Sequence, residues 1–218
     1  MVEILHSTVN VHSTYTVILI GFAHQVPKID PQAQFRAENS SVVMTGSYVI
    51  GVRHEAGDGG DIFGYGRWGD ESSIRMSNSN VTANASDKAI LFEWTVDEIL
   101  NISAIPLLIH DCNMFVNVLS TTRANASNTR AAVMIIQNDG EFSVISNVSL
   151  DFRRSNFQIS AMHSIGAFVN IHTEEKNMTL HHLNVSIAED CNIQVVAFDE
   201  SPQIRHNAIN IEVSYGGF

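Results

Sequence analysis

The chain has 218 residues, of which 44% are hydrophobic and 16% are charged, less than the roughly one quarter of charged residues that is typical of soluble domains. Its 12 basic and 23 acidic residues give a net charge of −11, which argues against binding to nucleic acid through a basic surface. No run approaches the roughly 18 consecutive apolar residues of a membrane-spanning helix, so we expect no transmembrane segment.

The N-terminal residues do not resemble a secretory signal peptide. From Met1 to His6 the chain is acidic and then polar, where a signal peptide begins with a basic region. We therefore expect either a cytosolic protein or a fragment of a longer one. Cys112 and Cys191 are too few for a disulfide framework, so they do not indicate the redox compartment.

Short apolar stretches rich in β-branched and aromatic residues recur along the chain, as is typical of β-strands. They begin near Val17, Tyr48, Ala89, Ala131, Ala167 and Gln194. Their successive spacings are 31, 41, 42, 36 and 27 residues, which indicates a repeated unit with loops of varying length.

Two shorter patterns accompany these stretches. The motif Asn-Val-Ser/Thr occurs at Asn80, Asn147 and Asn184, within alternating segments at residues 74–82, 142–152 and 178–187. A second repeated motif is Asp-Cys-Asn, which occurs as Asp111-Cys112-Asn113 and as Asp190-Cys191-Asn192, each directly before apolar residues. Together they predict that two strands joined by a polar turn repeat along the chain.

A two-strand unit cannot bury its apolar side alone, but stacked copies create a continuous core with parallel strand ladders. The sequence therefore predicts one all-β domain over residues 1–218, folded as a right-handed parallel β-helix of about six irregular coils. The alternative is an antiparallel β-sandwich, which also has short strands separated by turns. Open strand edges at the ends of a β-helix would permit self-association with another chain.

A glycine-rich segment at residues 53–73 is the longest expected loop insertion. Within it, Tyr65, Arg67 and Trp68 form a candidate ligand loop, because exposed aromatic rings combine apolar surface with a polar edge. The spacing of its aspartates does not match a calcium-binding EF-hand. We expect no metal site and no cofactor.

Acidic and basic residues in different expected coils are the candidates for catalysis on an outer strand face. They are Asp151, Arg153, Arg154, Glu174 and Glu175. The ten histidines follow no spacing typical of metal ligands, and the chain contains no nucleophile or phosphate-binding motif. A charged outer face gives the same pattern without catalysis, so we assign no catalytic residue.

Sequons for N-glycosylation are more frequent than chance predicts. Eight occur, whereas random placement of the 19 Asn and 33 Ser or Thr residues predicts about three. They are Asn39, Asn80, Asn84, Asn101, Asn125, Asn147, Asn177 and Asn184. The excess favours a secreted or cell-surface glycoprotein, although a repeat that needs Asn at turns also multiplies sequons.

The Asn-Val-Ser/Thr segments, the Asp-Cys-Asn turns and apolar runs such as residues 89–92 resemble the very large β-helical surface proteins of kinetoplastid protists known as the dispersed gene family. The resemblance covers roughly residues 34–218. It implies a cell-surface glycoprotein with a parallel β-helix ectodomain associated with adhesion. This sequence differs in being far shorter, and we expect neither a signal sequence nor a membrane anchor within it.

The expected function is that of a non-enzymatic structural or adhesive glycoprotein module, extracellular or at the cell surface, which acts through the faces of a β-helix. Its expected partners are glycans or a host or matrix surface. The alternative is a protein that binds or cleaves polysaccharides, of the lyase, hydrolase or phage-fibre type. A third reading, a virion or assembly subunit, would require the antiparallel sandwich.

Overall fold

The computed structural model describes residues 1–24, 34–56, 74–96, 99–102, 105–119, 129–138, 142–162, 165–173, 178–197 and 207–213. The regular elements within these ranges are β-strands. Among the described residues, no helix has the length and hydropathy needed to cross a membrane.

Sheet A is a ladder of parallel strands. Its order is β1, β4, β6, β9, β12 and β15, and β8 also pairs with β12. The strands are β1 (Val2–Leu5), β4 (Phe35–Glu38), β6 (Ile74–Ser77), β8 (Ile99–Ile102), β9 (Ile105–His110), β12 (Phe142–Arg153) and β15 (Met178–Ala188).

Sheet B is longer and bends into two segments. Its strands are β2 (Thr8–His12), β3 (Thr16–His24), β5 (Ser41–Ala56), β7 (Asn80–Val96), β10 (Asn113–Leu119), β11 (Thr129–Asn138), β13 (Asn156–Met162), β14 (Ile165–Thr173), β16 (Asn192–Ala197) and β17 (Asn207–Val213). The first segment contains β2, β10, β13, β16 and the N-terminal halves of β5 and β7. The second contains β3, β11, β14, β17 and the C-terminal halves of β5 and β7.

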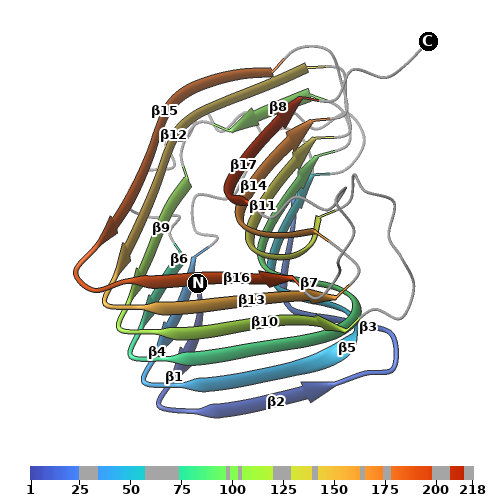
Figure 1. The fold of residues 1–218 in the computed structure, drawn as a ribbon, viewed down its shortest axis with the longest axis vertical. Helices are drawn as coiled ribbons and strands as arrows, with labels where there is room; N and C mark the ends of the chain where they lie inside the picture. Colours follow the sequence, from blue (N-terminus) through green and yellow to red (C-terminus); the bar gives the residue numbers. More distant parts are fainter. Residues whose placement is uncertain are drawn as a thin grey trace.

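The chain winds repeatedly through sheet A, the first segment and the second segment, so that the three form the sides of a β-solenoid (Figure 1). The pairings between the described strands are parallel, for example β10 with β13 and β12 with β15. The prediction of an all-β parallel β-helix is confirmed, and the antiparallel sandwich is wrong.

A repeated corner joins each strand of sheet A to the first segment of sheet B. It begins with a residue in the left-handed region, with φ between 45° and 61°, namely His6, Asn39, Asn78, Asp111, Arg154 or Asp190. Asn and Asp adopt this conformation more easily than most residues, which explains their frequency here. A serine or cysteine follows each of these residues: Ser7, Ser40, Ser79, Cys112, Ser155 and Cys191.

Hydrogen bonds connect these corners from one coil to the next. The backbone N–H of Ser40 donates to Ser79 Oγ at 3.2 Å, and that of Cys112 donates to Ser155 Oγ at 3.1 Å. The Ser155 hydroxyl in turn donates to the carbonyl of Arg153 at 2.7 Å. The buried polar groups of a corner therefore find hydrogen-bond partners within the protein, as buried polar groups require.

These corners correct the expected repeat. Equivalent corner positions are 33 to 43 residues apart, whereas the sequence pattern predicted 27 to 42. The short last spacing arose because Gln194 lies in β16 of the first segment, while the other five stretches lie in the second segment. There, β17 occupies the position that the stretch at Gln194 was expected to fill.

The Asn-Val-Ser/Thr motifs are likewise not equivalent. Asn80 begins a strand of sheet B, whereas Asn147 and Asn184 lie in sheet A, where Asn184 pairs with Ser149. The predicted equivalence of Asp111-Cys112-Asn113 and Asp190-Cys191-Asn192 is confirmed, because both segments form corners.

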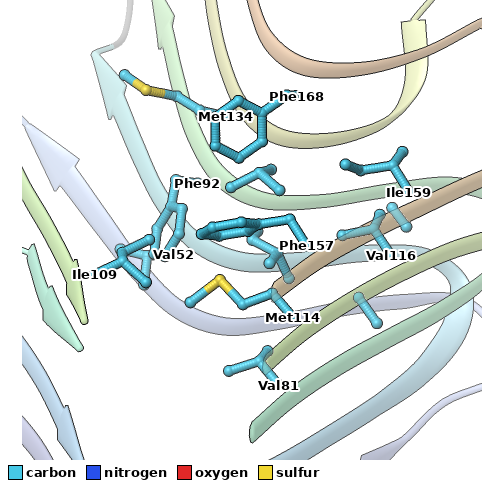
Figure 2. Packing of buried hydrophobic residues seen from close by; sticks show 14 of the residues in the cluster. Val52, Val81, Phe92, Ile109, Met114, Val116, Met134, Phe157, Ile159 and Phe168 are labelled. Atoms are coloured by element: carbon cyan, nitrogen blue, oxygen red, sulfur yellow. The ribbon is translucent and has the colours of Figure 1, made fainter. Parts of the chain in front are cut away.

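The core lies where the inner side chains of the three sides meet. Figure 2 shows Ile109 from sheet A, Met114 from the first segment and Phe92 from the second around a common interior. In one coil, Phe152 has its ring centroid 5.3 Å from that of Phe157 and 4.8 Å from that of Phe168. This contact of one ring from each side stabilises the solenoid, because large aromatic side chains bury much apolar surface.

Candidate functional site

Alternation along the strands gives two of the three sides of the solenoid outer faces of different chemistry. In β4 and β6, buried residues alternate with outward Arg36, Glu38, Arg75 and Ser77. Because successive side chains of a strand point to opposite sides, each outward position forms a row across neighbouring strands. We call the outer side of sheet A the charged face.

The first row of the charged face is formed by Glu3, Arg36, Arg75, Leu108, Asp151 and Ser186. A groove of about 580 Å³ lies on this face over β1, β4, β6 and β9, and Glu3, Arg36, Glu38, Arg75, Leu108 and His110 contribute to its lining. Arg36 forms ion pairs with both Glu3 and Glu38. The lining charges of the groove are therefore partly neutralised within the protein.

At the C-terminal ends of β9 and β12, two arginines hold aspartates. Arg154 donates to both carboxylate oxygens of Asp111, from Nε to Oδ1 at 2.6 Å and from Nη2 to Oδ2 at 2.9 Å. Arg153 binds Asp151 in the same two-point manner, at 3.0 and 2.8 Å. Glu189 lies near both arginines and pairs with Arg154. The network connects three successive coils.

These pairs keep both aspartates ionised. The hydrogen bond from Arg154 lowers the pKa of Asp111 below its usual range, and the hydrogen bond from Arg153 does the same for Asp151. In each case a carboxylate accepts charge-assisted hydrogen bonds that favour its deprotonated form. Such groups do not serve as general acids near neutral pH, which requires a raised pKa.

The structure brings together three of the five catalytic candidates. Asp151, Arg153 and Arg154 belong to this network, while Glu174 and Glu175 lie outside the described residues. Asp111 and Glu189 are members of the network that the sequence did not suggest, because they are 43 and 35 residues away from Arg154. Both residues lie at corners, and a corner can be identified from sequence. The sequence pattern indicated only two of the six described corners, those with Asp-Cys-Asn.

The outer side of the first segment of sheet B has a different character, and we call it the neutral face. Across β2, β5, β7, β10, β13 and β16 its outward positions carry no Asp, Glu, Lys or Arg. They are Thr8, Asn10, His12, Ser41, Val43, Thr45, Asn80, Thr82, Asn84, Asn113, Phe115, Asn117, Leu119, Asn156, Gln158, Ser160, Met162, Asn192, Gln194 and Val196. Sequence reasoning missed this face, because its rows exist only once the strands are in register.

Asparagine side chains are linked across the strands of the neutral face. Asn113 Nδ2 donates to Asn80 Oδ1 at 2.9 Å, and Asn117 Nδ2 donates to Asn84 Oδ1 at 2.9 Å. A further pair joins Asn192 Nδ2 to Asn156 Oδ1 at 2.8 Å. These ladders give a structural reason for some of the Asn residues that the sequence analysis assigned to sequons.

The expected glycosylation sites have different surroundings. Asn39 and Asn184 are exposed, whereas Asn84 is half-buried and accepts a hydrogen bond within its ladder. Asn101 and Asn147 lie in strands β8 and β12, and Asn125 and Asn177 lie outside the described residues. The candidate ligand loop of Tyr65, Arg67 and Trp68 also lies outside the described residues.

Comparisons with known proteins add no relative. No protein-family model, no curated protein and no solved structure matches the chain. The resemblance to the kinetoplastid surface proteins thus stays an expectation from the sequence.

Proposed function

We propose that this chain is a non-enzymatic module of a secreted or cell-surface structural or adhesive glycoprotein, which acts through the outer faces of its solenoid. The observation that carries the proposal is the regular presentation of side chains on these faces. Each outward position recurs on strand after strand, about 4.8 Å apart, as in any parallel ladder. Repeated rows suit an extended partner that contacts several coils at once.

The charged face supports binding better than catalysis. A glycoside hydrolase needs two carboxyl groups about 5 to 9.5 Å apart. Between Glu3 and Asp151 the first row carries Arg36, Arg75 and Leu108, so its two carboxylates are separated by three strands. Asp151 is also held ionised by Arg153.

Adhesion can be measured directly. Beads carrying the full chain should attach to a surface coated with extracellular-matrix extract more strongly than beads carrying an unrelated protein of equal net charge. Equal attachment of the two kinds of bead would overturn the adhesive function.

The proposal that the chain is N-glycosylated is tested separately. Treatment of protein from its native source with an N-glycosidase should lower its mass, and an unchanged mass would contradict it. Incubation with neutral and acidic polysaccharides should release no reducing ends. Release that is abolished by Asp151→Asn would show a cleaving enzyme instead.

A further inference from the structure

The neutral face contrasts with the rest of this acidic chain. The protein has a net charge of −11, yet the twenty outward positions named above carry only amides, hydroxyls, one histidine and five apolar side chains. Charged side chains lie instead on sheet A, as Arg36, Glu38 and Arg75 do, and at the corners, as Asp111, Arg154 and Glu189 do. A surface of this composition recognises a partner through neutral hydrogen bonds and apolar contacts rather than through ion pairs.

The register places three rows of this face side by side. Asn113 pairs with Asn80 and Asn156, and two residues along β10 Phe115 pairs with Thr82 and Gln158. Two residues further, Asn117 pairs with Asn84. Outward residues on a strand are about 6.6 Å apart, so the half-buried Phe115 lies between two rows that contain asparagine.

The asparagines retain hydrogen-bonding capacity towards solvent. A side-chain amide has two N–H donors and an oxygen with two lone pairs. The bond from Asn113 to Asn80 uses one donor of the first and one lone pair of the second, and both side chains are exposed. Because neighbouring asparagines hold one another in place, a ligand meets donors and acceptors that are already ordered, which lowers the entropic cost of binding.

Phe115 and Val43 add apolar surface to the central row of the face. A sugar ring combines an apolar C–H side with hydroxyl groups at its edge, which is complementary to an aromatic ring flanked by amides. A second copy of the chain fits less well, because two copies with a net charge of −11 repel each other, and because the apolar residues Val43, Phe115, Leu119, Met162 and Val196 are dispersed among polar ones rather than forming one apolar centre.

We propose that the neutral face binds an uncharged polysaccharide, with Phe115 contacting sugar rings and the flanking asparagine rows hydrogen-bonding their hydroxyl groups. This inference rests on the proposed function as a binding module and names the chemistry of its partner.

The test is a depletion isotherm of the full chain on three insoluble neutral polymers: microcrystalline cellulose, crystalline chitin and curdlan. We expect saturable binding to at least one of them, with the same affinity at low and high salt, because no ion pair is involved. Phe115→Ala should weaken this binding about tenfold, the loss of roughly 1.4 kcal/mol of contact energy. Phe115 points outward, so its truncation leaves no core cavity.

Leu108→Ala is the matched control, since Leu108 is also apolar, half-buried and outward, but on the charged face. It should bind as well as the unmodified chain. Gln158→Glu is a second, nearly isosteric test, because Gln158 pairs with Phe115 in the central row and its replacement adds a charge there. It should weaken binding too, with circular dichroism and thermal unfolding checking that each variant is folded.

Each contrary outcome is decisive. No binding to any of the three polymers would overturn the inference, as would loss of binding in Leu108→Ala but not in the two neutral-face variants. A dimer in solution that Phe115→Ala dissociates would assign the face to a second copy instead. None of these results decides the adhesion to matrix-coated surfaces, which tests the proposed function separately.

Discussion

Asn117 donates its side-chain amide to Oδ1 of Asn84 at 2.9 Å, although the two residues are 33 positions apart in the chain. Both are outward-facing and half-buried on neighbouring strands of the neutral face. The bond stabilises the stacking of two coils and at the same time orders the surface that we propose to bind sugars.

Removal of this bond should weaken the fold modestly. Asn117→Ala is expected to lower the free energy of unfolding by about 1 kcal/mol, the typical net contribution of a hydrogen bond. Asn10→Ala, at an exposed position of the terminal strand β2, should change it by less than about 0.5 kcal/mol. Urea unfolding followed by circular dichroism measures both, and equal effects would show that the asparagine ladder adds no stability.

Glycan occupancy should follow exposure. When the chain is secreted from a glycosylating host, peptide mapping by mass spectrometry should find Asn39 and Asn184 occupied in more molecules than Asn84. The first two are exposed, whereas Asn84 is half-buried beside Asn117. Highest occupancy at Asn84 would contradict its role as a ladder residue.

The corner hydroxyls should be needed for stability. Ser155→Ala removes the acceptor of the buried Cys112 N–H and should cost about 1 to 3 kcal/mol, because that group is then left without its partner. Ser155→Cys should be tolerated better, since cysteines occupy the equivalent corners at positions 112 and 191. If the two variants lost stability equally, the hydrogen-bonding role of the corner would be wrong.

The buried thiol of Cys112 should make the protein less stable at alkaline pH. Burial raises the pKa of this thiol from 9.0 to about 11. Between these values the unfolded chain loses the thiol proton while the folded chain keeps it. The free energy of unfolding should therefore fall as pH rises, by at most about 1.4 kcal/mol per pH unit.

Cys112→Ser provides the control for this prediction, because it keeps a small hydrogen-bonding side chain and lacks the titration. The difference in stability between the unmodified chain and this variant should change between pH 9 and pH 11 and stay constant below that window. A constant difference throughout would exclude burial of the thiol in the folded state.

Gly51 should not accept a side chain. A Cβ atom there would lie 2.6 Å from the carbonyl oxygen of Leu91 on the neighbouring strand β7, a backbone atom that cannot rotate away. Gly51→Ala should therefore cost about 1 to 3 kcal/mol. At Gly21 the nearest atom would be 3.7 Å away, so Gly21→Ala should not destabilise and serves as the matched control in thermal unfolding.

Part of the repeat was predictable because corners are local. The two Asp-Cys-Asn copies identified equivalent turns, since a left-handed residue favours Asn or Asp and the following residue must be small enough to be buried. Copies such as Asn39-Ser40-Ser41 and Arg154-Ser155-Asn156 were overlooked because serine replaces cysteine and arginine takes the first position. An allowance for these exchanges would have shown the true spacing.

The candidate site was less predictable. The sequence predicted three members of the network as charged candidates, namely Asp151, Arg153 and Arg154. Their partners Asp111 and Glu189 come from other coils. Local sequence does not encode which charged residue lies opposite which, because the loops between coils vary in length. The network therefore depends on pairings that span 35 to 43 residues.

Local sequence was enough to predict strands and a stacked parallel fold, because alternating apolar residues form a buried side wherever they occur, as Met114, Val116 and Val118 do in β10. Register came from tertiary contacts alone. If a strand shifts by two residues against its neighbour, the same side chains stay on the buried side. The alternating pattern therefore does not distinguish one such register from another. Packing of all three sides around rings such as Phe157 selects one, and with it the asparagine rows of the neutral face and the arginine–aspartate pairs of the charged face.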